Sequence, residues 1–503
     1  MSAPTEGRRG KRDICVAREK PMVGQRGFVP SVRVRILDEN DIRLIHAATL
    51  EVLERTGLSI TAPEGRQILL GAGATEGENS VIRIPPKLVE RAVESAPSSV
   101  VLSNRLGEAS CFLEGYTTSF GTGSDCPFIL DRETGERRKC TYEDVAAGAL
   151  VCDYLDNLDF VMPVGIISDR PTKLADVYAV EATMLATVKP VVFTAHNRNT
   201  FQASIDLAAA VAGGIEKLQE NPFICLYAEP TSPLRHMPEA TEKLIHAARM
   251  RIPVVFTPCP IMGASAPATG AGALVQGNAE TLSGLVLHQL VEPGAPFIYG
   301  GVMLPLDMST TIAPYGSPEL HKHCAALTDL AHHYGLPMFG TCGCSDAKRV
   351  DAQAGLELGF STLMATLAGQ NLIHDIGFLE SALITSFEMY LLADEAIGMA
   401  KHIASGVSVT GDTLAVDVIA SVGQFGDFLT HQHTLDFFRK ELYFPKFLDR
   451  TNYAGWQRLG RKTMDVRLKE KVDDILATHE PVPVEPRVRQ RMAEILRQAE
   501  TSM

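Results

Sequence analysis

The stretch GQNLIHDIGFLE at residues 369–380 is where the interpretation of this chain starts. Residues 370–374, with Leu372 and Ile373 at their centre, predict a buried strand, and apolar residues at i+4 spacing then predict a helix that begins near Phe378. His374 and Asp375 come at the carboxyl end of the predicted strand. In a barrel of alternating strands and helices, that end forms the mouth of the active site. The pair therefore matters if the rest of the chain repeats the pattern.

Seven similar units precede this stretch. Each is a short apolar run without strict alternation, as expected for a strand buried on both faces, followed by an amphipathic segment of helix length. Eight such units predict a (β/α)8 TIM barrel, and a doubly wound open sheet is the competing fold. The predicted strands are 117–121, 160–167, 190–195, 223–228, 253–257, 296–300, 336–341 and 371–374.

The remaining segments predict how the chain is divided. Residues 1–35 are basic and without pattern, which predicts a disordered tail. Residues 36–116 mix short helices and strand-like pieces, so we expect an N-terminal α/β extension that serves as a lid or platform. Residues 117–410 are the predicted barrel, and residues 411–503 are a predicted C-terminal helical region.

Composition narrows the class of protein. The net charge of −13 argues against binding to nucleic acid or to an anionic membrane, and no run of about 18 apolar residues predicts a membrane span. The 10 cysteines are scattered without a CxxC pair, and no signal sequence is recognisable, which together predict a cytoplasmic protein.

Polar and aromatic residues follow most of the predicted strands. In a barrel they would converge on one face. Some of these residues could have a structural role instead of a functional one. His374 could be a hydrogen-bonded structural residue, Glu229 a helix cap, and His196 and Asn197 turn formers. The residues at these strand ends are Ser124, Asp125, Ser168, Asp169, His196, Asn197, Tyr227, Glu229, Thr257, Gly300, Cys342, Ser345, His374 and Asp375.

Two groups of residues resemble metal ligands but have unsuitable spacing. His321 and Cys324 share a face of a predicted helix, whereas His323 does not. Cys342 and Cys344 are closer together than the usual zinc-binding pairs. We therefore predict no metal site. A P-loop, a GxGxxG turn after a strand and a GxSxG elbow are also missing from the sequence.

Six longer motifs occur in order along the chain and together resemble the trimethylamine methyltransferase family, from about residue 36 to the C-terminal region. They are FGTGSDCP (120–127), TAHNR (194–198), YAEPTSPL (227–234), YGGVMLPLDMST (299–310), GTCGCSDAKRVDAQAGLE (340–357) and GQNLIHDIGFLE (369–380).

The resemblance implies a barrel enzyme that passes a methyl group from an amine to the Co(I) corrinoid of a partner protein. Founding members of the family use pyrrolysine, whereas every residue of this chain is standard. The chain is therefore similar to the branch without pyrrolysine, whose members demethylate quaternary amines such as glycine betaine, proline betaine or carnitine. The resemblance implies no permanently bound cofactor, because the cobalamin or other corrinoid is supplied by the partner.

The chemistry of a quaternary amine defines what its site needs. The nitrogen is already cationic and leaves as a neutral tertiary amine, so positioning and electrostatics suffice. Aromatic faces and a carboxylate bind such a cation. We predict His374 and Glu229 as catalytic residues, with His374 meeting the carboxylate of a betaine. The predicted substrate-binding residues are Asp125, His196, Asn197, Tyr227, Tyr299 and Phe339.

Two other hypotheses remain open at this stage. The first is a barrel lyase or decarboxylase that uses Asp and His as acid–base groups. The second is a barrel without activity that binds a small ligand. The sequence also leaves open which methylated amine is the substrate and whether the chain forms a homo-oligomer.

Overall fold

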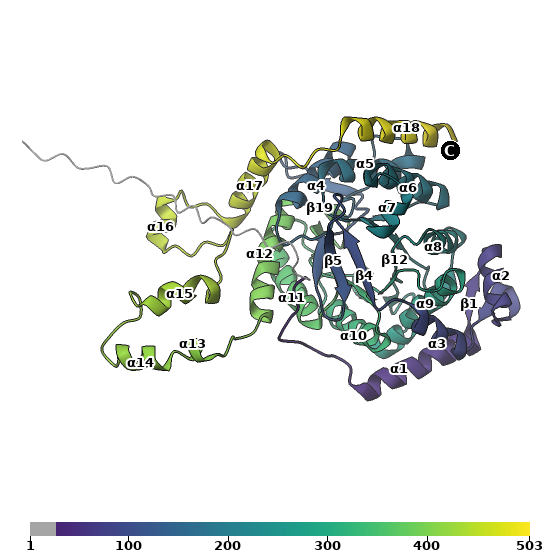
Figure 1. Ribbon diagram of the computed structural model, residues 1–503, viewed down its shortest axis with the longest axis horizontal. Helices are drawn as coiled ribbons and strands as arrows, with labels where there is room; N and C mark the ends of the chain where they lie inside the picture. Colours follow the sequence, from purple (N-terminus) through teal and green to yellow (C-terminus); the bar gives the residue numbers. More distant parts are fainter. Residues whose placement is uncertain (1–26, 503) are drawn as a thin grey trace, which may run out of the picture.

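The computed structural model describes residues 27–502, and its centre is a curled sheet of seven parallel strands (Figure 1). The strand order is β6-β17-β16-β14-β12-β10-β9. The strands are β6 (Ser119–Thr122), β9 (Val191–Thr194), β10 (Ile224–Ala228), β12 (Val254–Phe256), β14 (Phe297–Gly300), β16 (Met338–Thr341) and β17 (Leu372–Ile376).

Seven of the eight predicted strands therefore exist and are parallel. The predicted strand at 160–167 forms only two isolated bridges, Phe160 with Gly121 and Val161 with Val191, which connect the two edges of the sheet. The reason lies at Met162. Its N–H donates to the hydroxyl of Thr122 (2.7 Å), and its carbonyl accepts from the same hydroxyl (2.9 Å). Pro163 then lacks an amide hydrogen, so regular pairing ends.

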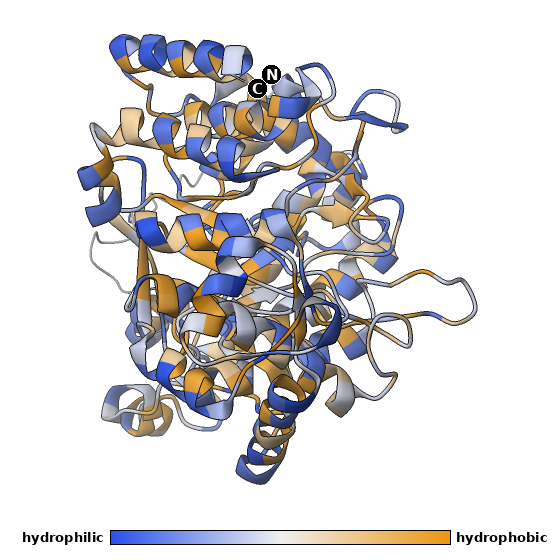
Figure 2. Cartoon of the chain, turned by 90° about the vertical axis from the view of Figure 1, so that its right-hand side faces the viewer, coloured by the Kyte–Doolittle hydropathy of each residue, from blue (hydrophilic) through white to orange (hydrophobic). Residues whose placement is uncertain are grey.

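A helix follows each strand on the outside of the sheet, and Figure 1 shows these helices around it. Figure 2 shows hydrophilic and hydrophobic residues alternating along the helices of one side, as expected when one face of each helix is buried. These helices are α4 (Tyr142–Tyr154), α5 (Ala175–Ala186), α6 (Arg198–Ala212), α8 (Pro238–Met250), α9 (Gly270–Val291), α10 (Pro318–Tyr334), α11 (Ala352–Ala368) and α12 (Phe387–Ala404).

The last helix starts later than predicted. α12 begins at Phe387 rather than near Phe378, because the backbone φ is +99° at Gly377 and is positive again at three consecutive residues, Glu380, Ser381 and Ala382. Such angles cannot continue a right-handed helix. The intervening residues instead form β18 (Phe378–Leu379) and β19 (Ile384–Thr385), which pair with each other.

Side chains alternate across each strand of the sheet. Inward residues such as Val192, Ile298 and Leu372 form one core with a hairpin, β4 (Ser99–Ser103) and β5 (Ala109–Glu114). The hairpin covers the amino end of the sheet, where Ser103 N–H donates to the carbonyl of Pro222 (2.8 Å) just before β10. The carboxyl end is thus the open one, and His374, two residues after Leu372, points inward there.

Short strands lie around the carboxyl end of the sheet. β13 (Ile261–Met262) and β15 (Leu304–Pro305) form a parallel pair. β7 (Phe128–Leu130) and β8 (Arg137–Lys139) form an antiparallel hairpin, and β19 pairs with β7 in parallel. These pieces fix loops that follow the main strands and surround their ends.

The N-terminal extension does not have a core of its own. Its helices are α1 (Glu39–Glu51), α2 (Pro63–Gly71) and α3 (Pro86–Ser95), and apolar residues of all three share one core with α9. Its sheet has the order β11-β1-β3-β2, and the strands are β1 (Leu58–Ile60), β2 (Thr75–Glu76), β3 (Val81–Arg83) and β11 (Arg235–His236). Because β11 follows β10 along the chain, this sheet ties the extension to a loop at the carboxyl end.

The predicted disordered tail extends too far. Residues 1–26 lie outside the described residues, but residues 27–35 are held by main-chain hydrogen bonds. Ser31 N–H donates to the carbonyl of Ala404 (2.8 Å), and Val34 N–H donates to that of Leu367 (2.9 Å). These bonds satisfy backbone groups that would otherwise need water, so the segment lies along α11 and α12.

The C-terminal region is helical. α13 (Gly411–Leu414), α14 (Val416–Val422), α15 (Gln432–Glu441) and α16 (Tyr453–Arg458) stand away from the body in Figure 1. α17 (Met464–Thr478) packs on α12 and α4, and α18 (Pro486–Ser502) packs on α6 and α5. Among the helices in residues 27–502, none has the length and apolar character needed to cross a membrane.

Candidate functional site at the carboxyl end of the sheet

Three aromatic rings meet inside the carboxyl end of the sheet. The ring centroid of His374 on β17 lies 4.1 Å from that of Phe339 and 6.1 Å from that of Tyr227. The rings of Tyr227 and Phe339 are 5.6 Å apart in an edge-to-face arrangement. The three predicted residues therefore form one cluster, because each stands at an inward position near the end of its strand.

His374 is oriented by two neighbours. Its Nδ1 lies 2.7 Å from the carbonyl oxygen of Gly340, and its Nε2 lies 3.2 Å from Oδ1 of Asp375. The hydroxyl of Thr341 donates to the other oxygen of Asp375. Asp375 has φ +76°, a left-handed conformation that Asp adopts more readily than most residues. The side chains of His374 and Asp375 are both buried.

Two further carboxylates stand above the aromatic cluster. Glu229 Oε2 accepts a hydrogen bond from the hydroxyl of Tyr227 (3.2 Å), and Asp125 Oδ1 accepts one from Thr194 (3.1 Å). Both acids keep solvent-accessible surface, yet surrounding protein raises the pKa of each, by burial first of all. That combination is typical of acids lining a hollow that water can enter.

A lysine faces these acids from α8. Burial lowers the pKa of Lys243, and the charges of Glu229, Asp176 and Asp125 oppose that shift. Its ammonium group donates to the carbonyl of Ala195, which follows β9. Lys243 is not among the predicted site residues, because it lies on a helix rather than at a strand end.

Asp125 and His196 share a pocket of about 390 Å³ with Thr194 and Asp176. Thr194 pairs with Tyr227 across β9 and β10, so this pocket lies next to the aromatic cluster. The backbone N–H of His196 donates to Asp176 (2.7 Å), and its side chain is exposed. Six predicted residues are thus neighbours around one end of the sheet: Asp125, His196, Tyr227, Glu229, Phe339 and His374.

Two predicted residues are placed elsewhere. Tyr299 is fully buried among the helices, where its hydroxyl donates to Asn278 (2.9 Å), because alternation along β14 turns it outward. Asn197 is the N-cap of α6, and its side-chain oxygen accepts from the N–H groups of Asn199 and Thr200. We therefore leave both residues out of the site.

Loops supply residues that the strand pattern could not reveal. Tyr315 and Cys259 are half-buried near the strand ends, and the charges of Glu229 and Asp375 act on both. The carboxylate of Asp346 holds the loop, since it accepts from the N–H groups of Tyr315 (2.9 Å) and Gly316 (3.0 Å). The only sequence signal for Tyr315 is its place in a long loop after a strand.

The residues weighed as metal ligands do not form a cluster. His321 and His323 are buried on α10, and the Cys324 thiol points at the carbonyl of Gly301. In the part of the chain that the structure describes, no three His, Cys, Asp or Glu side chains come together in a way that could hold a metal ion.

Comparison with known proteins identifies the family. The family model described as trimethylamine methyltransferase (MTTB) matches residues 5–503. The chain belongs to the trimethylamine methyltransferase family. It is 36% identical to the trimethylamine methyltransferase MttB of Desulfitobacterium hafniense over 92% of this chain and 93% of that protein. It is 33% identical to MttB of Methanosarcina thermophila, over 90% of this chain and 95% of that protein.

A relative with a different named substrate is also similar. A glycine betaine methyltransferase of Desulfitobacterium hafniense is 30% identical over 91% of this chain and 95% of its own length. Among solved structures, the monomethylamine methyltransferase of Methanosarcina barkeri superposes with a TM-score of 0.51 at 11% identity, covering 93% of this chain and 88% of that one. The structural match concerns the fold alone. Family membership confirms the expected methyltransferase.

Proposed function

We propose that this protein transfers a methyl group from a quaternary or tertiary methylated amine, such as a betaine, to the Co(I) corrinoid of a partner protein. The observation that carries the proposal is the cluster of Tyr227, Phe339 and His374 rings directly beside carboxylates, at the open end of the sheet of a family member. Aromatic faces next to a carboxylate are the combination that a desolvated ammonium group needs.

We also propose that the sheet is a closed (β/α)8 barrel, with the bridges at Phe160 and Val161 as its eighth strand. Two observations support this proposal: the two edge strands are joined through those residues, and a helix follows every strand. The proposed division of the chain keeps an extension at 36–116, the barrel at 117–410 and the helical region at 411–503. The barrel places every strand end on one rim.

The chain's own contribution is to bind and orient a cation. The rings of Tyr227 and Phe339 would face the methyl groups, and Glu229 with Asp125 would supply negative charge. Burial makes the ionised form of these acids costly when the site is empty, so a bound cation compensates for that cost. A substrate that carries its own positive charge is therefore favoured over a neutral amine.

The leaving group sets the demand for acid catalysis. When the methyl group leaves a quaternary nitrogen, the electron pair of the broken C–N bond stays on nitrogen and gives a neutral tertiary amine. The chain then needs no acid to protonate the leaving group, and positioning is the larger part of catalysis. In the proposed reaction the corrinoid, when bound, supplies Co(I), a strong nucleophile that accepts the methyl group.

The arrangement of the mouth suits a cofactor that arrives from outside. Asp125, His196 and Glu229 keep solvent-exposed surface at the strand ends, so a partner's cofactor could approach them. We therefore propose that the corrinoid stays on its partner and that this chain binds no cofactor permanently.

The test is a substrate panel with chemically reduced Co(I) cobalamin as acceptor. Glycine betaine, proline betaine, carnitine and trimethylamine are each incubated with the protein, and two signals are followed: loss of the Co(I) absorbance and appearance of the demethylated amine. We expect both signals with at least one quaternary amine. Failure of every amine with both free cobalamin and candidate corrinoid proteins would refute the proposal.

A further inference from the structure

The pocket beside the aromatic cluster is larger than a methylated ammonium group requires. It has a volume of about 390 Å³ and is here called the side pocket; the start of α5, the end of β9 and loop 165–173 line it. At its inner end, the hydroxyl of Thr194 donates to Asp125 (3.1 Å), and Thr194 pairs with Tyr227 of the cluster. At roughly 30 Å³ per non-hydrogen atom, the share of a water molecule in the liquid, it has room for on the order of ten such atoms.

Apolar side chains form much of the wall of the side pocket. Ile167 and Ala179 are buried, Ala175 is half-buried at the start of α5, and Ile166 is 49% exposed beside them. Such a wall removes the carbon atoms of a ligand from water, which is favourable in proportion to the area covered. The side pocket therefore suits a ligand tail with several carbon atoms.

Two carboxyl groups also face the side pocket. Asp176 on α5 accepts the backbone N–H of His196 (2.7 Å), and Asp125 lies at the inner end. The charge of Asp176 acts on Asp125, so the two groups are near each other. A ligand carboxylate between them would be repelled by both, whereas a ligand hydroxyl group could donate to either. The lining of the side pocket thus discriminates against a negatively charged tail.

The aromatic cluster has the same bias. Both ring nitrogens of His374 are engaged, Nδ1 by the carbonyl of Gly340 (2.7 Å) and Nε2 by Asp375 (3.2 Å). Neither nitrogen is left to bind a carboxylate of the substrate. The charges of Glu229 and Asp375 both act on the hydroxyl of Tyr227. A carboxylate close to the ammonium group, as in a short betaine, would therefore meet acids here as well.

The basic side chains near the site do not reverse this bias. The ammonium group of Lys243 donates to the carbonyl of Ala195, and the charges of Glu229, Asp176 and Asp125 all act on it. Lys173 lines the side pocket but is exposed to solvent, where its charge is screened. The region around the bound amine thus remains negative.

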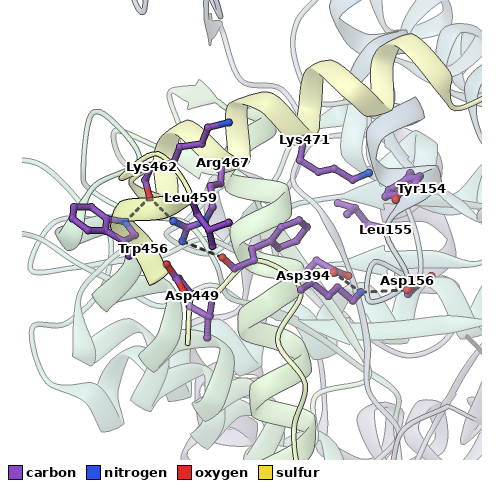
Figure 3. Close-up of a pocket in the computed structure, with 13 residues that line it drawn as sticks. Tyr154, Leu155, Asp156, Asp394, Asp449, Trp456, Leu459, Lys462, Arg467 and Lys471 are labelled. Carbon is purple, nitrogen blue, oxygen red and sulfur yellow. Dashed lines mark hydrogen bonds and ion pairs between the residues drawn. The ribbon is translucent and has the colours of Figure 1, made fainter. Parts of the chain in front are cut away.

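A larger pocket of about 510 Å³ lies between α4, α17 and the segment that precedes α17 (Figure 3). Within it, Asp394 and Asp156 bind the ammonium group of Lys446 at 2.6 and 3.3 Å. The residues that line it include none from the side pocket and none from the aromatic cluster. It therefore does not extend the site, and the side pocket is the one in position to receive a substrate tail.

We propose that the side pocket binds the tail of the substrate, and that this tail is a chain of several carbon atoms with an uncharged donor such as a hydroxyl group. The inference rests on the proposed function, because the methylated ammonium group is placed in the aromatic cluster. From there the tail passes Thr194, reaches Asp125 and lies against Ala175 and Ala179. The substrate is then larger than trimethylamine and ends differently from glycine betaine.

The first test measures affinity against tail length by titration calorimetry. Tetramethylammonium fills only the aromatic cluster, whereas the ethyl, propyl, butyl and pentyl trimethylammonium ions extend progressively into the side pocket. Affinity should rise about threefold with each added methylene group, because each one is removed from water. A pentyl ion that binds no more tightly than tetramethylammonium would overturn the proposal.

The second test fills the side pocket. Ala175→Leu should weaken binding of the pentyl ion at least tenfold and change that of tetramethylammonium less than twofold. Ala179→Leu, one helical turn further along α5, gives the same test if the first change disturbs the start of the helix. The matched control is Ala147→Leu, at a half-buried alanine of α4 that does not line the side pocket. Equal losses for both ions in both α5 variants would contradict the proposed tail site.

The third test compares end groups on tails of one length. At neutral pH, the 3-hydroxypropyl trimethylammonium ion should bind more tightly than the butyl ion, and the 3-carboxypropyl compound at least tenfold more weakly than the hydroxyl compound. Asp125→Asn keeps a side chain that tolerates the φ of +62° and removes the charge, so it should narrow the second difference at least threefold. Glu216→Gln, at an exposed acid of α7, should not. Tightest binding of the carboxylate compound would refute the assigned tail chemistry.

These titrations separate the inference from the proposed function, because they need neither a corrinoid nor methyl transfer. If no methylated amine binds, the proposed function and the inference fall together. If tetramethylammonium binds and neither a longer nor a hydroxylated tail improves affinity, the inference alone is wrong.

Discussion

The Nε2 atom of His374 lies 3.2 Å from Oδ1 of Asp375, its immediate neighbour in sequence. Asp375 has a positive φ, and in this backbone conformation its carboxylate lies against the imidazole of the preceding residue. On the other side of the ring, Nδ1 faces the carbonyl of Gly340, which can only accept, so this nitrogen carries a proton. Both ring nitrogens are therefore held, and the plane of the imidazole is fixed against Phe339.

This geometry predicts the effect of removing the imidazole. His374→Ala should reduce kcat/KM for methyl transfer by at least 100-fold, because the ring that contacts both Tyr227 and Phe339 is lost. The melting temperature should stay within a few degrees of the wild type. The matched control is Tyr299→Phe on β14, which should keep full activity and lose about 1 kcal/mol of stability with its bond to Asn278. Global unfolding of His374→Ala would favour a structural role instead.

Because Asp375 has a positive φ, two variants can measure separately the effect of its carboxylate charge and the effect of backbone strain at this position. Asp375→Asn retains a side chain that tolerates this conformation, so the fold should persist while affinity for a cationic amine falls at least tenfold. Asp375→Ala should in addition destabilise the protein by about 1 kcal/mol, because Ala adopts a left-handed conformation less readily. Calorimetric titration and thermal unfolding of both variants measure the two effects. Equal substrate affinity in wild type and Asp375→Asn would remove Asp375 from the site.

Tyr227 offers a test of the aromatic contact with the cation. Tyr227→Phe keeps the ring and loses only the hydrogen bond to Glu229, so KM should change less than about fivefold. Tyr227→Leu removes the ring face and should raise KM at least tenfold, equivalent to about 1.4 kcal/mol. Steady-state kinetics with the best amine of the panel decide the point. If both variants raise KM to the same extent, the hydroxyl rather than the ring is the group that contributes to substrate binding.

The raised pKa of Glu229 predicts opposite pH trends for binding and for stability. Burial favours the protonated acid in the empty site, and a bound cation favours the carboxylate, so binding releases a proton and affinity should rise with pH. The folded pKa of Glu229 lies above the unfolded one, so the contribution of Glu229 to the free energy of unfolding should be largest at acid pH and be lost as pH rises through the folded pKa. Glu229→Gln should flatten both trends and be more stable than the wild type at neutral pH by about 1 kcal/mol.

Asn197 provides a negative control at a residue that the sequence had placed in the site. Its side chain caps α6 through the N–H groups of Asn199 and Thr200. Asn197→Ala should therefore cost about 1 kcal/mol of stability, whereas Asn197→Ser should cost little, and both should keep their KM. A raised KM in Asn197→Ser at unchanged stability would return this residue to the substrate site.

Periodicity located the strands well and their ends less well. Short apolar runs found seven strands of the sheet, because a strand buried on both faces needs that composition whatever its neighbours are. Regular pairing at 160–167 failed for a reason outside the run itself, since the hydroxyl of Thr122 binds both backbone groups of Met162. The start of α12 was misplaced because a side-chain pattern does not reveal the positive φ angles at residues 380–382.

By itself, the sequence determined the repeating strand and helix units, the family, and most of the residues that gather at the strand ends. These depend on local composition and on motifs that are contiguous in the chain. Only the tertiary structure decided that Tyr299 faces the helices, that Asn197 is a cap, and that Lys243 and Tyr315 approach the site. The reason is physical: which way a side chain points depends on the register of its strand, and which loops reach the site depends on contacts between residues far apart in sequence.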